Sequence, residues 1–216
     1  MGFTDFKNIS RVAYKFNCEV EKTNFIEQTE FDCEEWMFKY ITKNIESGPS
    51  YSSEASICER IISPIINLIA EAHNLPVWSH VQLDVNKELD LVGTPDYLLA
   101  PALPGEEEYK LPIACIGEAK KDKFTEGWGQ TASEMIAAQM LNKNKKVPIY
   151  GLVTNGSFWE FGKLEGNKLT LEKKAFSASR DLQEIFNVLN WFFCEASKSA
   201  EILLDIEAKE LAANNQ

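Results

Sequence analysis

The order of helix-like and strand-like segments in the middle of the chain most constrains its fold. Apolar residues spaced three and four apart between Ile57 and Ala72 predict a helix with one buried stripe, which Pro64 should bend. Three extended segments follow, VQLDVNKELDLVG, DYLLAP and LPIACIGEAK, and the polar turn LPGEEEYK joins the last two. A second helix comes next, and its buried side should carry Trp128, Ala132, Ile136 and Met140. With the apolar strand VPIYGLVTN after it, this order predicts an α/β fold.

The two ends of the chain predict additions to this core. Residues 1–48 indicate an N-terminal extension that is irregular except for a short helix around FDCEEWMFKYITKN, and it ends in the turn SGPS. Residues 162–216 complete a hairpin of SFWEFGKL and NKLTLEKKAF, which turns at Glu165-Gly166. The hairpin is followed by a long amphipathic helix that carries Leu182, Ile185, Phe186, Leu189 and Phe193. We therefore expect a single domain over residues 1–216, with its core at 49–161.

Charge and composition limit the partners of this chain. A formal net charge of -11 opposes binding to duplex DNA, which depends on Lys and Arg neutralising phosphates. Lysines gather at residues 120–123 and 143–146, and each cluster is either part of a positive face or a solvated run. The sequence has no signal-peptide pattern and no apolar run near the ~20 residues that span a bilayer. We expect a cytoplasmic protein without a membrane partner, whose five scattered cysteines are reduced.

Two strand ends should bring charged residues together. Side chains two apart in a strand share a face, so Glu118 and Lys120 should point the same way while Ala119 points into the packing. The preceding strand begins at GTPD, and folding the intervening hairpin back would bring Asp96 and Glu118 to one edge of the sheet. Adjacent carboxylates repel unless they share a proton or bind a cation. Mg2+ prefers oxygen ligands of this kind, so the pattern predicts a metal site.

These residues also carry a resemblance to a known superfamily. Pro95-Asp96 followed by Glu118-Ala119-Lys120 resembles the PD-(D/E)xK nucleases, whose core runs helix, three strands, helix, strand. The segments SEASICERIISPI, GTPDYLL, GEAKK and VTNGSFWEF are similar to the N-terminal nuclease domains of type I restriction enzyme motor subunits and their stand-alone relatives. This likeness covers roughly residues 53–161. It implies a restriction endonuclease-like, three-layer core with a mixed central sheet, and hydrolysis of DNA phosphodiester bonds with Mg2+ or Mn2+ as cofactor.

The resemblance assigns roles to particular residues. Asp96 and Glu118 would bind the metal, the carbonyl of Ala119 would add a ligand, and Lys120 would assist the attacking water. Glu54 matches a glutamate that assists metal binding in the relatives, although a first-turn carboxylate favoured by the helix dipole explains it equally. Gln130 matches a glutamine near the active site, with a plain surface glutamine as the alternative.

Other polar and aromatic residues receive no catalytic role. His73 and His80 flank a turn without a partnering motif, and Glu59 falls on the solvated face of the first helix. Trp159 and Phe161 alternate on a strand and are expected in the core or an interface.

The expected partner is DNA, and two questions of assembly stay open. Large apolar residues surround much of the C-terminal helix, and Trp191 and Phe192 flank its main stripe, so we expect a homodimer through this region. A protein partner is another source of the positive surface that the acidic chain lacks. The alternative to a nuclease is a catalytically inactive subunit of the same fold that serves binding or assembly.

Overall fold

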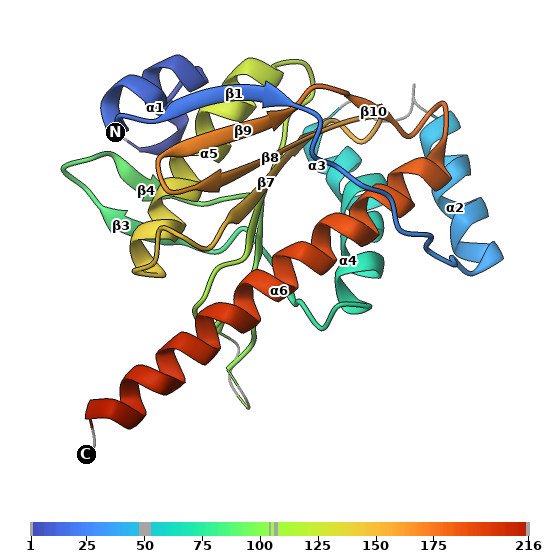
Figure 1. Cartoon of the computed structure of the whole chain (residues 1–216). Helices are drawn as coiled ribbons and strands as arrows, with labels where there is room; N and C mark the ends of the chain where they lie inside the picture. The colour runs from blue at the N-terminus through green and yellow to red at the C-terminus, as the bar shows by residue number, and fades with distance from the viewer. Residues whose placement is uncertain (1, 48–52, 104, 106–107, 215–216) are drawn as a thin grey trace.

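A mixed sheet runs through the centre of the molecule in the computed structural model, which describes residues 2–47, 53–103, 105 and 108–214. In these residues the sheet has eight strands in the order β1-β9-β8-β7-β6-β5-β2, with β10 paired to β8 (Figure 1). The pairs β1/β9 and β6/β7 are parallel and the others antiparallel. The strands are β1 (Glu19–Thr23), β2 (Val77–Ser79), β5 (Tyr97–Leu99), β6 (Cys115–Ala119), β7 (Ile149–Thr154), β8 (Phe158–Glu165), β9 (Lys168–Glu172) and β10 (Phe176–Ser177). The predicted α/β class with a mixed central sheet flanked by helices is confirmed.

One face of the sheet is covered by the helix α5 (Phe124–Leu141). Outside α5 lie the short 3-10 helix η1 (Phe3–Asp5), the helix α1 (Ile9–Phe16) and a separate hairpin of β3 (Leu83–Asn86) and β4 (Leu91–Gly93). Gly129 permits this second layer, since a Cβ there would lie 2.0 Å from the backbone oxygen of Phe6. Because α5 is enclosed from both sides, most of its side chains are buried, including polar ones.

The opposite face is covered by α3 (Glu54–Ile57), η3 (Cys58–Ile62), α4 (Ser63–Glu71), α2 (Glu35–Glu46) and the long α6 (Leu182–Asn214). Alternate residues of the strands supply the two cores: Leu99 and Leu152 pack on this side, whereas Leu98 and Val153 pack on the α5 side. The result is a sheet between two layers of helices.

The first predicted helix contains an irregularity next to Pro64. Its helical path continues from α3 through η3, a π-helical turn, into α4, where Pro64 occupies the first turn. A π turn inserts one extra residue, so it shifts the side chains that follow. The buried stripe therefore runs through Ile61, Ile65 and Ile69, and the prediction that it would end at Ala72, which is exposed, is wrong.

Several other expectations need correction. The segment VQLDVNKELDLVG is the β3–β4 hairpin outside the main sheet, not one of its strands, because its middle turns at Lys87 to Asp90. The N-terminal extension is ordered: α2 is confirmed, but β1 also joins the sheet beside β9. Met140 is exposed, since it lies at the last turn of α5. The turn SGPS lies outside the described residues from position 48 onward, and LPGEEEYK lies partly outside them.

The C-terminal hairpin and helix are part of the main structure. The hairpin is β8 and β9, both in the central sheet, and the predicted stripe of α6 is buried. Phe192 is also fully buried, with its ring centroid 4.8 Å from that of Phe161, and Trp191 packs against Phe25 of the same chain at 6.4 Å. The two residues that suggested a homodimer therefore have packing partners in their own chain: Phe161 of β8 for Phe192, and Phe25 for Trp191. Trp159 and Phe161 lie in the core, as expected.

The far half of α6 extends past the sheet (Figure 1). Ile202 and Leu211 are exposed there. Within the residues that the structure describes, none of the helices has the length and apolar content needed to cross a bilayer.

Candidate functional site

Asp96 and Glu118 meet where β5 begins and β6 ends. Asp96 precedes β5, and Glu118 lies on the neighbouring antiparallel strand. Each carboxylate accepts a backbone hydrogen bond from the other segment: Ala119 N donates to Asp96 Oδ2 at 2.8 Å, and Asp96 N donates to Glu118 Oε1 at 3.2 Å. This reciprocal pairing fixes both side chains to the sheet, so the site does not depend on a flexible loop.

Lys120 completes the cluster from the position just after β6. Its ammonium lies 2.9 Å from Glu118 Oε2 and 4.0 Å from Asp96 Oδ2. The two carboxylates are therefore closer than the ~8 Å at which they could no longer share a cation. Burial lowers the pKa of Lys120, but the charges of Glu118 and Asp96 outweigh that effect and raise the pKa overall. Lys120 is a cation at neutral pH.

A third carboxyl approaches the cluster from α5. Glu134 is fully buried, and its Oε1 accepts a hydrogen bond from Gln130 Nε2 at 3.2 Å. Its Oε2 has no hydrogen-bond partner among the described residues, and the Glu134 carboxyl as a whole is close enough to Glu118 for the two to interact electrostatically. Burial raises the pKa of Glu134 to about 8, with a smaller contribution from Asp96.

The same burial acts on Glu118. Loss of water, and then repulsion from Glu134 and Asp96, raise its pKa well above the ordinary range despite the attraction of Lys120. Two buried carboxyls and one partly buried carboxyl thus face a single ammonium. Such an arrangement is stable only if protons or another cation reduce the negative charge.

The remaining predicted residues lie nearby but are not equivalent. Gln130 is buried and touches the cluster only through Glu134. Glu54 is exposed in the first turn of α3, and its Oε2 accepts a hydrogen bond from the backbone N of Lys121 at 3.0 Å. Ala119 packs into the core with its side chain, as expected, and its N–H holds Asp96. All of them surround the end of β6.

Two residues beside the cluster were missed from the sequence. Glu134 follows Gln130 by four positions, so the helical spacing alone could have placed both on one face. His80 Nε2 lies 3.7 Å from Asp96 Oδ1, and the backbone N of His80 donates to Asp96 O at 3.2 Å. His80 has a positive φ of 54° in a turn between β2 and β3, and no local pattern signals this approach.

The donor set fits a hard cation better than a soft one. Carboxylate oxygens dominate the cluster, and neither His nor Cys forms a pair suited to zinc. In the described residues, no three His, Cys, Asp or Glu side chains form a complete metal-binding group. Mg2+ and Mn2+ need only one or two protein carboxylates, with water and substrate as further ligands, and Asp96 and Glu118 meet that requirement.

No protein-family model and no curated protein sequence matches this chain. The fold and the site define it as a mixed α/β protein with a buried carboxylate and lysine cluster at the end of β6.

Proposed function

We propose that this chain is a nuclease of the restriction endonuclease-like class, which hydrolyses phosphodiester bonds in DNA with the help of Mg2+ or Mn2+. The observation that carries the proposal is the convergence of Asp96, Glu118 and Lys120 on adjacent strand ends. Asp96 comes from one motif and Glu118 and Lys120 from another, and backbone hydrogen bonds hold the two carboxylates to the sheet. A surface aspartate and lysine brought together by chance would not be tied to a fully buried glutamate.

The electrostatics of the cluster support cation binding. Glu118 and Glu134 have raised pKa values chiefly because they are buried, and repulsion from neighbouring carboxyls adds to the effect. A divalent cation supplies the missing charge and would allow both groups to ionise. Asp96 and Glu118 would hold it, and the backbone of Ala119 lies beside them.

The chain's own residues have separable tasks in this proposal. A bound divalent cation polarises a phosphate and lowers the pKa of water. Asp96 and Glu118 position it, and the two backbone hydrogen bonds keep their oxygens in place. Lys120, beside both carboxylates, orients a nucleophile or stabilises negative charge that develops on the phosphate.

The arrangement of elements is a second support for this class. A helix, the antiparallel strands β2, β5 and β6, the helix α5 and the strand β7 parallel to β6 follow each other in the order of that nuclease core. The differences are the inserted β3–β4 hairpin and the added strands β8, β9 and β1. Neither addition separates the residues of the cluster.

A non-catalytic subunit with a relic site is the second candidate. The net charge of -11 and the ion pair that already occupies Lys120 and Glu118 favour it. A nuclease needs an approach for a polyanion, and an acidic chain offers one only where lysines gather or where a partner provides it.

Calorimetric titration with Mn2+ separates the two candidates. The Asp96→Asn and Glu118→Gln variants should lose the Mn2+ binding that the wild-type protein shows. The Lys120→Met variant should retain it. Glu88→Gln is the matched control, because Glu88 is exposed in the β3–β4 turn and its loss removes the same charge. Wild-type protein that binds no Mn2+ would favour the non-catalytic candidate.

Cleavage of plasmid and single-stranded DNA tests the chemistry itself. We expect activity with Mg2+ or Mn2+ that EDTA stops, that both carboxylate variants lack, and that Lys120→Met reduces by about 100-fold or more. Activity that is the same in all variants would come from a contaminating nuclease and would refute the proposal.

A further inference from the structure

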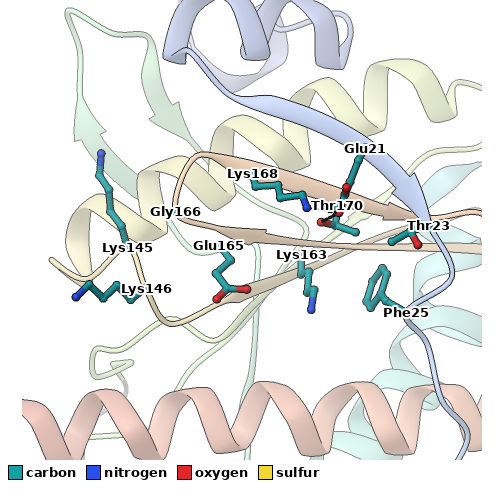
Figure 2. A pocket seen from close by; sticks show the side chains of 10 residues that line it. All are labelled: Glu21, Thr23, Phe25, Lys145, Lys146, Lys163, Glu165, Gly166, Lys168 and Thr170. Carbon is teal, nitrogen blue, oxygen red and sulfur yellow. Dashed lines mark hydrogen bonds and ion pairs between the residues drawn. The ribbon is translucent and has the colours of Figure 1, made fainter.

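A concave surface far from the carboxylate cluster gathers lysines from three parts of the chain. It lies among β1, β8, β9 and the loop between α5 and β7, and its volume is about 610 Å³. Figure 2 shows Lys163 on β8, Lys168 on β9, and Lys145 and Lys146 on the loop at one end. We call this surface the lysine pocket. It is the place where the second lysine cluster of the sequence meets the sheet.

The framework of the lysine pocket is fixed by hydrogen bonds. The backbone N of Gly166, in the β8–β9 turn, donates to the carbonyl of Lys145 at 2.5 Å. Gln139 of α5 donates to Gly166 O at 3.0 Å, and Asn144 Oδ1 accepts from Lys146 N at 2.8 Å. The loop and the turn are thus joined, so the backbone positions of the lysines are set before any ligand arrives.

The lysine pocket has more positive charge than its acidic residues balance. Lys168 pairs with Glu21 at 2.8 Å, so those two charges cancel. Within the described part of the chain, Lys145, Lys146 and Lys163 form no ion pair. Lys163 lies over the ring of Phe25 at 5.3 Å from its centroid, and Glu165 is another acid at the rim. Glu19 lies opposite Lys168 on the same face, so four ammonium groups meet three carboxylates and leave a net positive charge in a chain whose total is -11.

The lysine pocket is separate from the carboxylate cluster. Lys163 lies opposite Tyr150 near the start of β7, whereas Glu118 lies opposite Val153 near its end. The two residues also face opposite sides of the sheet. Lys163 shares a face with Phe161, which packs on α6, while Glu118 interacts with Glu134 of α5. A ligand in one site does not fill the other.

We propose that the lysine pocket binds a ligand with several phosphate groups. Lysine is a mobile point charge suited to phosphate, and three separated ammonium groups match a chain of phosphates better than a single anion. The volume is in the range of small-ligand sites, about 300–1,000 Å³. Lys145 and Lys146 point outward in Figure 2, and their exposed, flexible side chains can turn to the ligand while the backbone stays in place. A free nucleotide and a nucleic-acid backbone both offer this chemistry.

Calorimetry of the full chain in EDTA tests the proposal without involving the metal site. The probes are inorganic triphosphate, ATP and a single-stranded oligothymidylate, each at low ionic strength. The variant Lys145→Gln/Lys146→Gln/Lys163→Gln should bind at least about tenfold more weakly than wild type. Its matched control is Lys43→Gln/Lys87→Gln/Lys209→Gln, which loses the same charge on other elements and should bind as wild type does. The double variant Lys145→Gln/Lys146→Gln changes exposed side chains only and should fold normally. A partial loss of affinity in this double variant would show that the weaker binding of the triple variant does not come from misfolding.

The three probes also distinguish the source of the phosphates. Binding of triphosphate and ATP indicates a nucleotide site, and binding of the oligonucleotide alone indicates a nucleic-acid backbone. No binding by any probe, an equal loss in the control variant, or equal competition by a polyglutamate peptide would overturn the proposal. Failure here leaves Mn2+ binding and cleavage at Asp96 and Glu118 unaffected, so the two proposals are refuted by different results.

Discussion

Glu134→Gln tests the electrostatics of the cluster most directly, because it removes one buried charge and keeps the shape. The folded protein raises the pKa of Glu134 from the ordinary 4.5 to about 8, chiefly through burial. Since the folded state holds this proton more tightly than the unfolded state, its contribution to stability is complete below about pH 4.5 and is lost as the pH rises toward 8. Between pH 5 and pH 8 that loss is on the order of 3 kcal/mol in the free energy of unfolding.

The glutamine variant has no proton to lose at this position. It should therefore resemble wild type at pH 5 and become more stable than wild type by about 3 kcal/mol at pH 8, in the absence of divalent cations. In urea unfolding followed by tryptophan fluorescence, that difference moves the midpoint by more than about 1 M. Gln130, which now donates to Glu134 Oε1, can still pair with the amide oxygen.

A control separates this effect from the general acidity of the chain. Glu207→Gln removes an exposed carboxylate on α6 and should leave the difference between pH 5 and pH 8 as in wild type. Equal pH dependence in wild type and Glu134→Gln would refute the reasoning, because Glu134 would then be ionised and compensated in the folded state.

Two further predictions concern the packing that holds the site. Gly129→Ala should destabilise the fold by about 3 kcal/mol, since the new Cβ would meet backbone atoms of Phe6 and Asn8 at 2.0 and 2.6 Å. A thermal unfolding midpoint equal to that of the wild type would contradict the close approach of η1 and α5. Phe192→Ala should cost about 3–5 kcal/mol because the ring is fully buried, whereas Phe158→Ala, at an exposed ring, should cost about 1 kcal/mol or less. The unfolding midpoint of the Phe192 variant should not depend on protein concentration. A midpoint that does depend on it would indicate that Phe192 lies at a subunit interface.

Local patterns in the sequence were sufficient for the elements around the site. The apolar run before Glu118, the turn at Pro95-Asp96 and the helix after Lys123 each carry their own signal, because strand and helix periods are properties of adjacent residues. The relation between Glu118 and Lys120 also follows from the strand period, and their 2.9 Å ion pair agrees with it. The hairpin turn at Gly166, with φ of 64°, was equally local.

Only the tertiary structure decided what surrounds these elements. Burial of Glu134 depends on α5 being enclosed by η1 and α1, which come from residues far away in the sequence. The approach of His80 to Asp96 depends on the turn between β2 and β3, and the cover over Trp191 depends on Phe25. Long-range pairing of this kind is set by the sum of many contacts, and no single segment encodes it. The sequence by itself determined which residues could do chemistry at the end of β6, and the packing of distant segments determined their charge state and their neighbours, because burial is a property of the whole fold.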